Sequence, residues 1–425
     1  MLARFLSNVR GSVAPLLGLV ALPLMTAVGM AVDYSRANAD RAAFQVALDS
    51  TALMLSKTAA TDSNADLQTQ ATETFNSLFN RPGVTNIQVT PTYTADGGSK
   101  LVLSGSAVVN TSFLGLIGVS AINISSESTS TWGNTRLRVA LVLDNTGSMN
   151  DAGKIGALKT AAQNLLNQLS SAALHPDDVY VSIVPFVKDV NVGPANYNQN
   201  WVRWDLWDAA NGTCSNTTYK SQSSCVSHAK VWTPAAHSTW NGCVTDRDQN
   251  FDTTNDAPVA GSTLYPAEQY SSCPSASVVG LTNDWTALGN MVSSMTANGN
   301  TNQAIGLQLG WQTLTGAPFT VPSVDPNYKY QTVIILLTDG LNTQDRWYTT
   351  ASSIDARQQK TCNNIKAAGI TLYTVQVNTG GDPTSTLLQN CASDPGKFFL
   401  LTSAGEIVTT FGQIGTSLSK LRLAM

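Results

Sequence analysis

Residues 137–149, which read LRVALVLDNTGSM, decide the fold of the C-terminal part of the chain. Residues 139–143 form an unbroken apolar run, which is typical of a strand buried on both faces of a parallel sheet. The run ends at Asp144, and Thr146 and Ser148 follow at alternating positions. Open α/β sheets bind their ligands in the loops beyond the carboxyl ends of the strands. The stretch therefore predicts an α/β domain with a binding loop directly after this strand.

This loop offers only hard oxygen donors, which suit an octahedral cation such as Mg2+. The same residues also have simpler structural explanations. Asp144 and Ser148 are favoured at helix N-caps. Further along the chain, the Asp-Gly pair at 339–340 is typical of a turn. An aspartyl-phosphate phosphatase loop would also place an Asp after a buried strand. It would need a second carboxylate two positions later, where this chain has Thr146.

The segment Asp144-x-Thr146-x-Ser148 resembles the D-x-[ST]-x-S loop that begins the metal-ion-dependent adhesion site (MIDAS) of the von Willebrand factor A (vWA) domain. Two later segments resemble the family in the required order. Residues 299–302 (GNTN) resemble its G-x-T-N segment, and residues 333–340 (VIILLTDG) are a second buried strand that ends in Thr-Asp-Gly. The resemblance implies a doubly wound, mostly parallel, Rossmann-like sheet. It also implies a site for Mg2+ (or Mn2+ or Ca2+) made of Asp144, Thr146, Ser148, Thr301 and Asp339.

The pattern after residue 134 alternates between strands and helices, as a doubly wound sheet requires. The predicted strands after the first are residues 179–187, 333–337, 370–377 and 397–401. The predicted helices are residues 154–169, 284–295, 304–314, 356–368, 387–392 and 406–421.

The N-terminal region predicts a membrane anchor. Arg4 and Arg10 precede residues 11–32, which carry no charge, and 22 helical residues reach about 33 Å, enough to cross a bilayer core. The basic residues favour a cytoplasmic N-terminus. A cleavable signal peptide is the competing interpretation, but its apolar region is typically about 7–15 residues long. The longer run, and the helical pattern that follows it, favour a retained anchor with the remainder of the chain exported.

Residues 10–36 (RGSVAPLLGLVALPLMTAVGMAVDYSR) resemble the N-terminal region of TadG-like proteins of tight-adherence (Flp) pilus assembly systems. Gly11 is followed by SVAPL without a Glu at the fifth position, so we expect no prepilin cleavage. We expect three parts: a membrane anchor and pilin-like helix over residues 1–60, a small module over 61–133 and a vWA domain over 134–425.

The expected small module is α+β. Residues 66–80 read as a helix that ends at the breaker cluster Arg81-Pro82-Gly83. Alternating runs at 85–93, 100–110 and 122–132 predict strands, with a turn at 95–98 between the first two. Residues 111–121 (TSFLGLIGVSA) are apolar but too few to span a membrane, and we expect a buried helix or a connector there.

Residues 191–281 depart from the vWA pattern as an insertion of about ninety residues that holds four of the six cysteines. A zinc site at Cys214, Cys225, His228, His237 and Cys243 would not have the usual ligand spacing, and an exported domain favours disulfides. Several pairings are possible; sequence order favours Cys214–Cys225 and Cys243–Cys273, and we expect Cys362 to pair with Cys391. The insertion also contains five tryptophans, which can form its core or an aromatic binding surface: Trp201, Trp204, Trp207, Trp232 and Trp240.

The composition limits the function. A net charge of −4 makes nucleic acid an unexpected partner. The three histidines lie apart in sequence from the metal loop, and no nucleophile–base pair is recognisable, so we expect no enzyme. An envelope hydrolase would need such a pair.

The resemblances imply an assembly or adhesion factor in the bacterial inner membrane, with a single pass and a periplasmic vWA domain. Its partner would be a protein, among pilus or envelope components, that offers an acidic residue to the metal. The alternative is a structural minor-pilin-like subunit, or an envelope scaffold without a working metal site.

Overall fold

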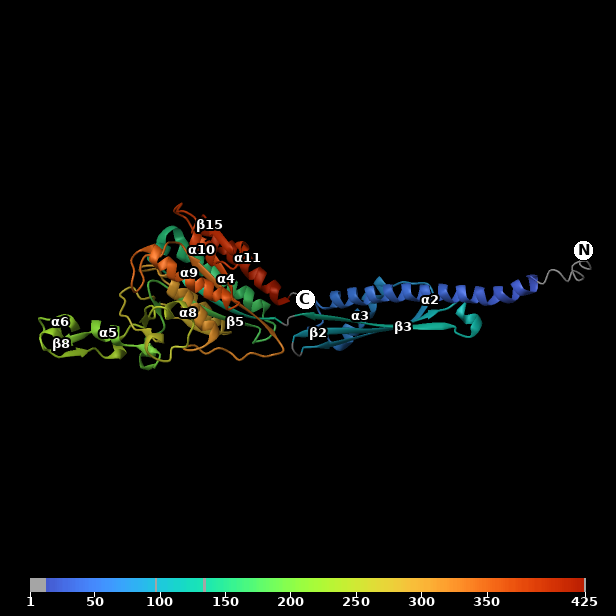
Figure 1. Cartoon of the computed structure of the whole chain (residues 1–425), viewed down its shortest axis with the longest axis horizontal. Coiled ribbons are helices and arrows are strands. Elements are labelled where there is room, and N and C mark those ends of the chain that lie inside the picture. The colour runs from blue at the N-terminus through green and yellow to red at the C-terminus, as the bar shows by residue number, and fades with distance from the viewer. Residues whose placement is uncertain (1–12, 96–97, 133–134, 424–425) are drawn as a thin grey trace, which may run out of the picture. The chain divides into compact units, whose positions relative to one another are not determined.

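The computed structural model describes residues 13–95, 98–132 and 135–423 (Figure 1). The chain divides into two compact units, one before residue 135 and one over residues 135–423. The described residues of the first unit share one buried cluster, and those of the second surround two. Each unit is therefore treated as a separate body.

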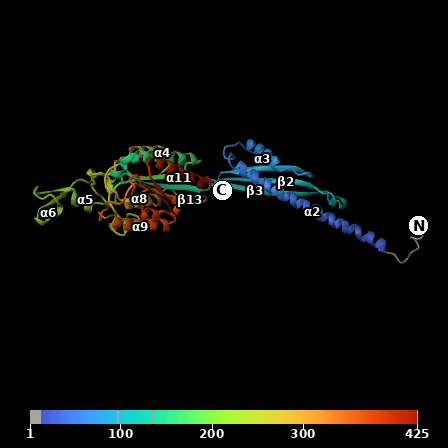
Figure 2. The same cartoon turned by 90° about the horizontal axis from the view of Figure 1, so that it is seen from above.

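The first unit contains two helices and an antiparallel sheet in the order β1-β2-β3. Its elements are α2 (Val13–Leu55), α3 (Asn64–Leu78), β1 (Val84–Thr94), β2 (Ser99–Asn110) and β3 (Ala121–Trp132). Both helices contribute to the same core as the sheet (Figure 2). Of the turn predicted at 95–98, residues 96 and 97 lie outside the described residues.

The two halves of α2 differ in burial. Phe44 in the second half is fully buried and packs edge-on against Phe75 of α3, with ring centroids 4.9 Å apart. The helix approaches β2 so closely that a Cβ atom on Gly105 would lie 2.8 Å from the Phe44 ring. Residues 37–59 and 67–132, which belong to the two parts that we expected to be separate, contribute buried side chains to one core.

In the first half of α2, Leu19, Leu24 and Met25 are exposed. Its mean hydropathy reaches 1.6 over 18 residues, and within the described residues α2 is the one helix long and apolar enough to cross a membrane. A signal sequence would have the same properties.

The segment between β2 and β3, for which we expected a buried helix or a connector, is not a buried helix. It forms a single 3-10 turn, η1 (Leu114–Ile117), in which no residue is buried. Gly118 adopts a positive φ of 92° and ends the turn, so the chain reverses into β3. Of the two alternatives that we expected, a buried helix and a connector, the structure shows the connector.

The second unit is built on a mixed sheet in the order β10-β6-β5-β4-β13-β14-β15, with β12 also paired to β5. The parallel strands are β4 (Thr135–Asp144), β5 (Val179–Phe186), β13 (Lys329–Thr338), β14 (Thr371–Val377) and β15 (Phe398–Leu401). The antiparallel additions are β6 (Val190–Asn191), β10 (Cys243–Val244) and β12 (Val279–Thr282). The prediction of a doubly wound, mostly parallel sheet is confirmed.

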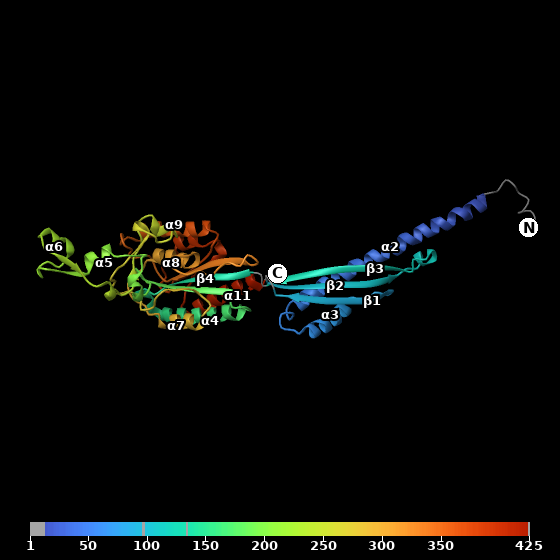
Figure 3. The ribbon, with the colours of Figure 1, turned by 90° about the horizontal axis from the view of Figure 1, so that it is seen from below.

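Helices cover both faces of this sheet (Figure 3). One face carries α4 (Lys154–Ala172), α7 (Trp285–Ser294) and α11 (Gly405–Leu423), and the other carries α8 (Gln303–Thr315), α9 (Ala351–Ala367) and α10 (Thr386–Cys391). Strand β4 is buried on both sides, because Leu141 and Leu143 join the first core while Ala140 and Val142 join the second. This explains its unbroken apolar sequence.

Between β6 and β12 the insertion contains only short elements. Besides β10 they are η3 (Pro194–Asn198), β7 (Val202–Arg203), α5 (Asp205–Ala210), β8 (Gly212–Cys214), α6 (Gln222–Ser227), β9 (Trp232–Pro234), η4 (His237–Thr239), η5 (Phe251–Thr253), η6 (Gly261–Thr263) and β11 (Tyr265–Pro266). A further 3-10 turn, η7 (Pro395–Lys397), precedes β15.

Disulfides and tryptophans hold this insertion together. Cys214–Cys225 and Cys243–Cys273 lie within the insertion, whereas Cys362–Cys391 links α9 to α10 outside it; these are the pairings that we favoured. The cysteines of the alternative zinc site are therefore oxidised. Trp207 and Trp240 are buried, and Trp201 and Trp204 pack against the same core. The tryptophans thus serve mainly as a core.

Candidate metal-binding site

The register of two parallel strands brings the two predicted aspartates to one edge of the sheet. Leu337 of β13 lies opposite Leu143 of β4. Asp144 ends β4, and Asp339 directly follows the last residue of β13. The carboxyl ends of both strands therefore deliver a carboxylate to the same place.

Asp144 is fully buried and held from two sides. Its Oδ1 accepts a hydrogen bond from the Thr146 backbone N–H at 2.7 Å, and its Oδ2 accepts one from the Thr338 hydroxyl at 2.6 Å. Burial, and next the neighbouring carboxylate of Asp339, raise the pKa of Asp144 to about 6. Thr338 was not among the predicted site residues, although it belongs to the Thr-Asp-Gly segment.

The two predicted hydroxyls connect the loops after β4 and β13. Ser148, in η2 (Gly147–Gly153), donates a hydrogen bond to Asp339 Oδ1 at 2.7 Å. The Thr146 and Ser148 hydroxyl oxygens lie 3.1 Å apart. Four of the five predicted residues are thus joined by one chain of hydrogen bonds that includes Asp144.

Thr301, the fifth residue, lies in the segment between α7 and α8, which borders both loops. The Gly147 N–H donates to the Gly299 carbonyl at 3.0 Å, which ties this segment to the loop after β4. The Thr301 N–H donates to the Thr343 hydroxyl at 2.8 Å, which ties it to the chain after Asp339. The side chain of Thr301 is buried between them.

The positively charged side chain of Lys154, which was not among the residues predicted from the sequence, lies beside the Asp339 carboxylate. Lys154 Nζ donates to Asp339 Oδ2 at 2.5 Å, and only 7% of the Lys154 side chain is exposed. Lys154 is the first residue of α4, where the helix dipole disfavours a positive charge. A lysine at that position, shortly after a run of oxygen donors, is the sequence signal that could have identified it.

The donor set fits a hard divalent cation. Asp144 and Asp339 bring two negative charges, of which Lys154 neutralises one, and the hydroxyls of Thr146 and Ser148 add neutral oxygen ligands. Within the described part of the chain, no group of three or more His, Cys, Asp or Glu side chains is arranged to hold a metal. The fit therefore depends on the hydroxyls.

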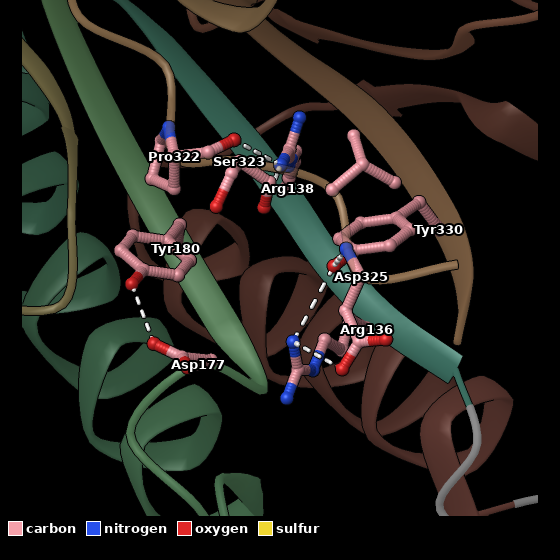
Figure 4. A pocket seen from close by; sticks show the side chains of 9 residues that line it. Arg136, Arg138, Asp177, Tyr180, Pro322, Ser323, Asp325 and Tyr330 are labelled. Atoms are coloured by element: carbon pink, nitrogen blue, oxygen red, sulfur yellow. Dashed lines mark hydrogen bonds and ion pairs between the residues drawn. The ribbon is translucent and has the colours of Figure 1, made fainter. Parts of the chain in front are cut away.

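A cavity of about 270 Å³ lies at the other end of β4 (Figure 4). Its charged groups already have partners: Arg138 donates to the Pro322 carbonyl at 2.6 Å, and Asp177 accepts from the Tyr180 hydroxyl at 2.8 Å. Arg136 lies 3.9 Å from Asp325. This cavity is separate from the candidate metal site, because Arg136 and Arg138 begin the strand that Asp144 ends.

The fold, with its site residues at the carboxyl edge of the sheet, defines a vWA-type α/β domain, and the family models agree. Residues 269–413 match the model of the von Willebrand factor type A domain, and residues 11–60 match the Tad model, Flp pilus-assembly TadE/G-like. The chain thus combines a TadE/G-like N-terminal segment with a vWA domain. The Asp144 loop precedes the matched part of the domain. No curated protein matches the chain.

Several solved structures are similar to this chain in part. The pilus adhesin SpaC from Lactobacillus rhamnosus GG is 14% identical, with a TM-score of 0.39, over 81% of this chain and 36% of SpaC. The vWF domain of the type V pili tip protein Mfa5 from Porphyromonas gingivalis is 10% identical, with a TM-score of 0.39, over 68% of this chain and 97% of that domain. Proximal thread matrix protein 1 from the mussel byssus, with a zinc-occupied MIDAS motif, is 13% identical, with a TM-score of 0.35, over 68% of this chain and 47% of that protein. The chain thus spans little more than a third of SpaC.

Proposed function

We propose that this protein is a membrane-anchored factor of a bacterial tight-adherence pilus system, and that its vWA domain binds a protein partner through a divalent cation. Asp144, Thr146, Ser148, Thr301 and Asp339 would hold the cation. The observation that carries the proposal is the hydrogen bond from Ser148 to Asp339, because it joins the two loops that supply the predicted ligands. The TadE/G-like match supports the pilus context.

The charges at the site favour Mg2+, or Mn2+ or Ca2+ in its place. Asp144 is fully buried beside a second carboxylate, and this arrangement is most stable when a cation shares both. A bound divalent ion would offer a coordination position to a carboxylate of the partner. The task of the protein's own residues is to hold the donors in place and to keep water from Asp144.

The surface next to the site has an apolar contact point. Leu341, two residues after Asp339, is 60% exposed. An apolar side chain beside a charged centre suits a partner that presents an acidic residue within an apolar surface. A role in binding without turnover agrees with this surface.

The N-terminal helix would place this domain outside the cytoplasm. The uncharged stretch of α2 would span the inner membrane once, with its basic N-terminal side in the cytoplasm. Pilus or envelope components are then the accessible partners.

Mn2+ titration of the full-length protein in detergent, followed by electron paramagnetic resonance (EPR) of free Mn2+, tests the metal site. We expect one saturable site per chain, lost in Asp144→Ala and weakened in Ser148→Ala. Asp151→Ala is the matched control, because this exposed carboxylate lies in the same 3-10 turn as Ser148. Saturable binding that Asp144→Ala leaves intact would contradict the assignment, provided that circular dichroism shows a folded variant.

One observation favours the alternative of a scaffold without a working metal site. The Lys154 ammonium already neutralises one charge of the carboxylate pair. In that case wild-type protein would bind no Mn2+ in the titration, and the N-terminal helix would make the protein a minor-pilin-like subunit or an envelope scaffold.

A further inference from the structure

A second exposed apolar segment lies in the first unit, next to the helix proposed as the anchor. Residues 111–120, here called the apolar loop, connect β2 to β3 and carry no charge. Leu116 is 80% exposed and Ile117 is 54% exposed. Soluble monomeric proteins rarely expose neighbouring large apolar side chains unless another molecule or a membrane covers them.

The apolar loop is fixed against α2 near the end of its uncharged stretch (Figures 1 and 3). Gly29 is buried, and a Cβ atom there would lie 2.6 Å from Phe113. Four residues further along α2, Asp33 accepts the backbone N–H groups of Phe113 and Leu114, each at 2.8 Å. The contact therefore includes the last uncharged turn of the helix.

Most backbone N–H groups of the apolar loop form hydrogen bonds with acceptors in the protein itself. Asp33 takes the N–H groups at the start of the loop, Thr111 N–H donates to the Ser120 carbonyl at 3.1 Å, and Val119 N–H donates to the Leu114 carbonyl at 3.0 Å. The Thr111 hydroxyl donates to the Val119 carbonyl at 2.5 Å. A backbone segment in a membrane needs such internal hydrogen bonds, because hydrocarbon offers no hydrogen-bonding groups.

The depth of the apolar loop in the bilayer can be judged from its contact with Gly29, counted from Asp33, where the uncharged stretch of α2 ends. At a rise of 1.5 Å per residue, Gly29 lies about 6 Å from Asp33 toward the uncharged stretch. That distance is within the depth of about 5–10 Å at which apolar faces of interfacial segments lie. The exposed side chains of the loop and of α2 would then face the same medium.

We propose that the apolar loop inserts into the interfacial layer of the membrane leaflet from which α2 emerges. It gives the first unit a second point of attachment, which fixes its orientation on the membrane surface. The inference rests on the proposed retention of α2 as a membrane anchor. The loop would contact lipid acyl chains and would need no particular headgroup, because it carries no charge.

The test is EPR of the full-length protein in phosphatidylcholine nanodiscs that hold one chain each, with a spin label on one introduced cysteine. The native cysteines are disulfide-bonded and leave the new thiol as the labelling site. The labelled variants are Leu116→Cys in the loop, Leu24→Cys on α2 and Ser104→Cys on the exposed face of β2. Oxygen, which concentrates in lipid, and a nickel chelate, which stays in water, report the depth of each label.

We expect the Leu24→Cys label to be accessible mainly to oxygen, the Leu116→Cys label to have a shallower lipid position, and the Ser104→Cys label to be accessible to the nickel chelate. If the label at residue 116 behaves like that at 104 while the label at 24 lies in lipid, the anchor stands and the loop inference fails. If the label at 24 is also in water, the anchoring proposal itself fails. Shielding of residue 116 that appears only when several chains share a disc would mean a protein contact, and would overturn lipid insertion.

Discussion

Lys154 Nζ lies 2.5 Å from Oδ2 of Asp339, although the two residues are 185 positions apart in the sequence. The ion pair is almost fully buried, and its ammonium group lies beside one of the two carboxylates that would bind the metal. The Lys154 ammonium and a divalent cation would therefore compete for Asp339.

Replacing Lys154 should strengthen metal binding. In Lys154→Met, loss of an interaction worth about 1.4 kcal/mol at Asp339 would raise the affinity for Mn2+ about tenfold. Without metal the same variant should melt at a lower temperature than wild type, because two buried carboxylates lose their only described counter-charge. Calorimetric titration and thermal melts measure both effects.

The matched control for this substitution is Lys159→Met. Lys159 lies on the same helix but donates to the Met295 carbonyl, away from both aspartates. It should leave the metal affinity unchanged. A Lys154→Met variant with wild-type affinity would refute the competition.

The stability of the second unit should fall as the pH rises from about 4 to about 8. Asp246 is buried, and burial, followed by the carboxylates of Asp345, Asp252 and Asp189, raises its pKa to about 8. An unfolded aspartate titrates near 3.9. Between these values the folded protein keeps a proton that the unfolded chain releases, so the free energy of unfolding decreases with pH.

The variant Asp246→Asn should reduce this slope, because an amide imitates the neutral acid. Its melting temperature should exceed that of wild type by several degrees at pH 8 and approach it near pH 4. Some slope should remain, because burial also raises the pKa of Asp189 to about 7. Equal slopes in the two proteins, measured by melts in a series of buffers, would show that Asp246 is ionised in the folded state.

The disulfides should differ in their effect on the fold. Cys362 and Cys391 are fully buried, and their bond links α9 to the end of α10. Removing it in Cys362→Ser/Cys391→Ser should lower the free energy of unfolding by about 2–4 kcal/mol. The comparison is Cys214→Ser/Cys225→Ser, whose bond closes a short loop within the insertion. Denaturant titration should show the smaller loss for this second pair.

The strands and the vWA loops could be predicted because their signals are local. The uninterrupted apolar residues of β4 and β13 reflect burial on both faces, and the motif residues follow directly after each strand. Parallel pairing of the two strands then brings Asp144 and Asp339 together.

The missed features depend on contacts that local patterns do not encode. The position of Lys154 shortly after the oxygen donors marks it in the sequence, but its partner Asp339 lies 185 positions away and is identified only by the packing of the start of α4 beside the end of β13. Residues 111–121 left a buried helix and a connector open, because apolar character alone does not show which of the two a segment forms. Likewise, the shared core of α2, α3 and the β1-β2-β3 sheet is built from contacts between residues far apart in the sequence, such as Phe44 against Phe75 of α3.

The most direct measurement is a thermal melt of the full-length protein in detergent with Mg2+ and with EDTA, for wild type, Asp144→Ala and Asp339→Ala. At about 100 times its dissociation constant, a ligand stabilises the folded state by about 2.7 kcal/mol, which corresponds to a shift of a few degrees. We predict that wild type shows this shift and that both variants, although folded by circular dichroism, lose it. A wild-type melting temperature that is the same in Mg2+ and in EDTA would contradict metal-dependent binding at this site.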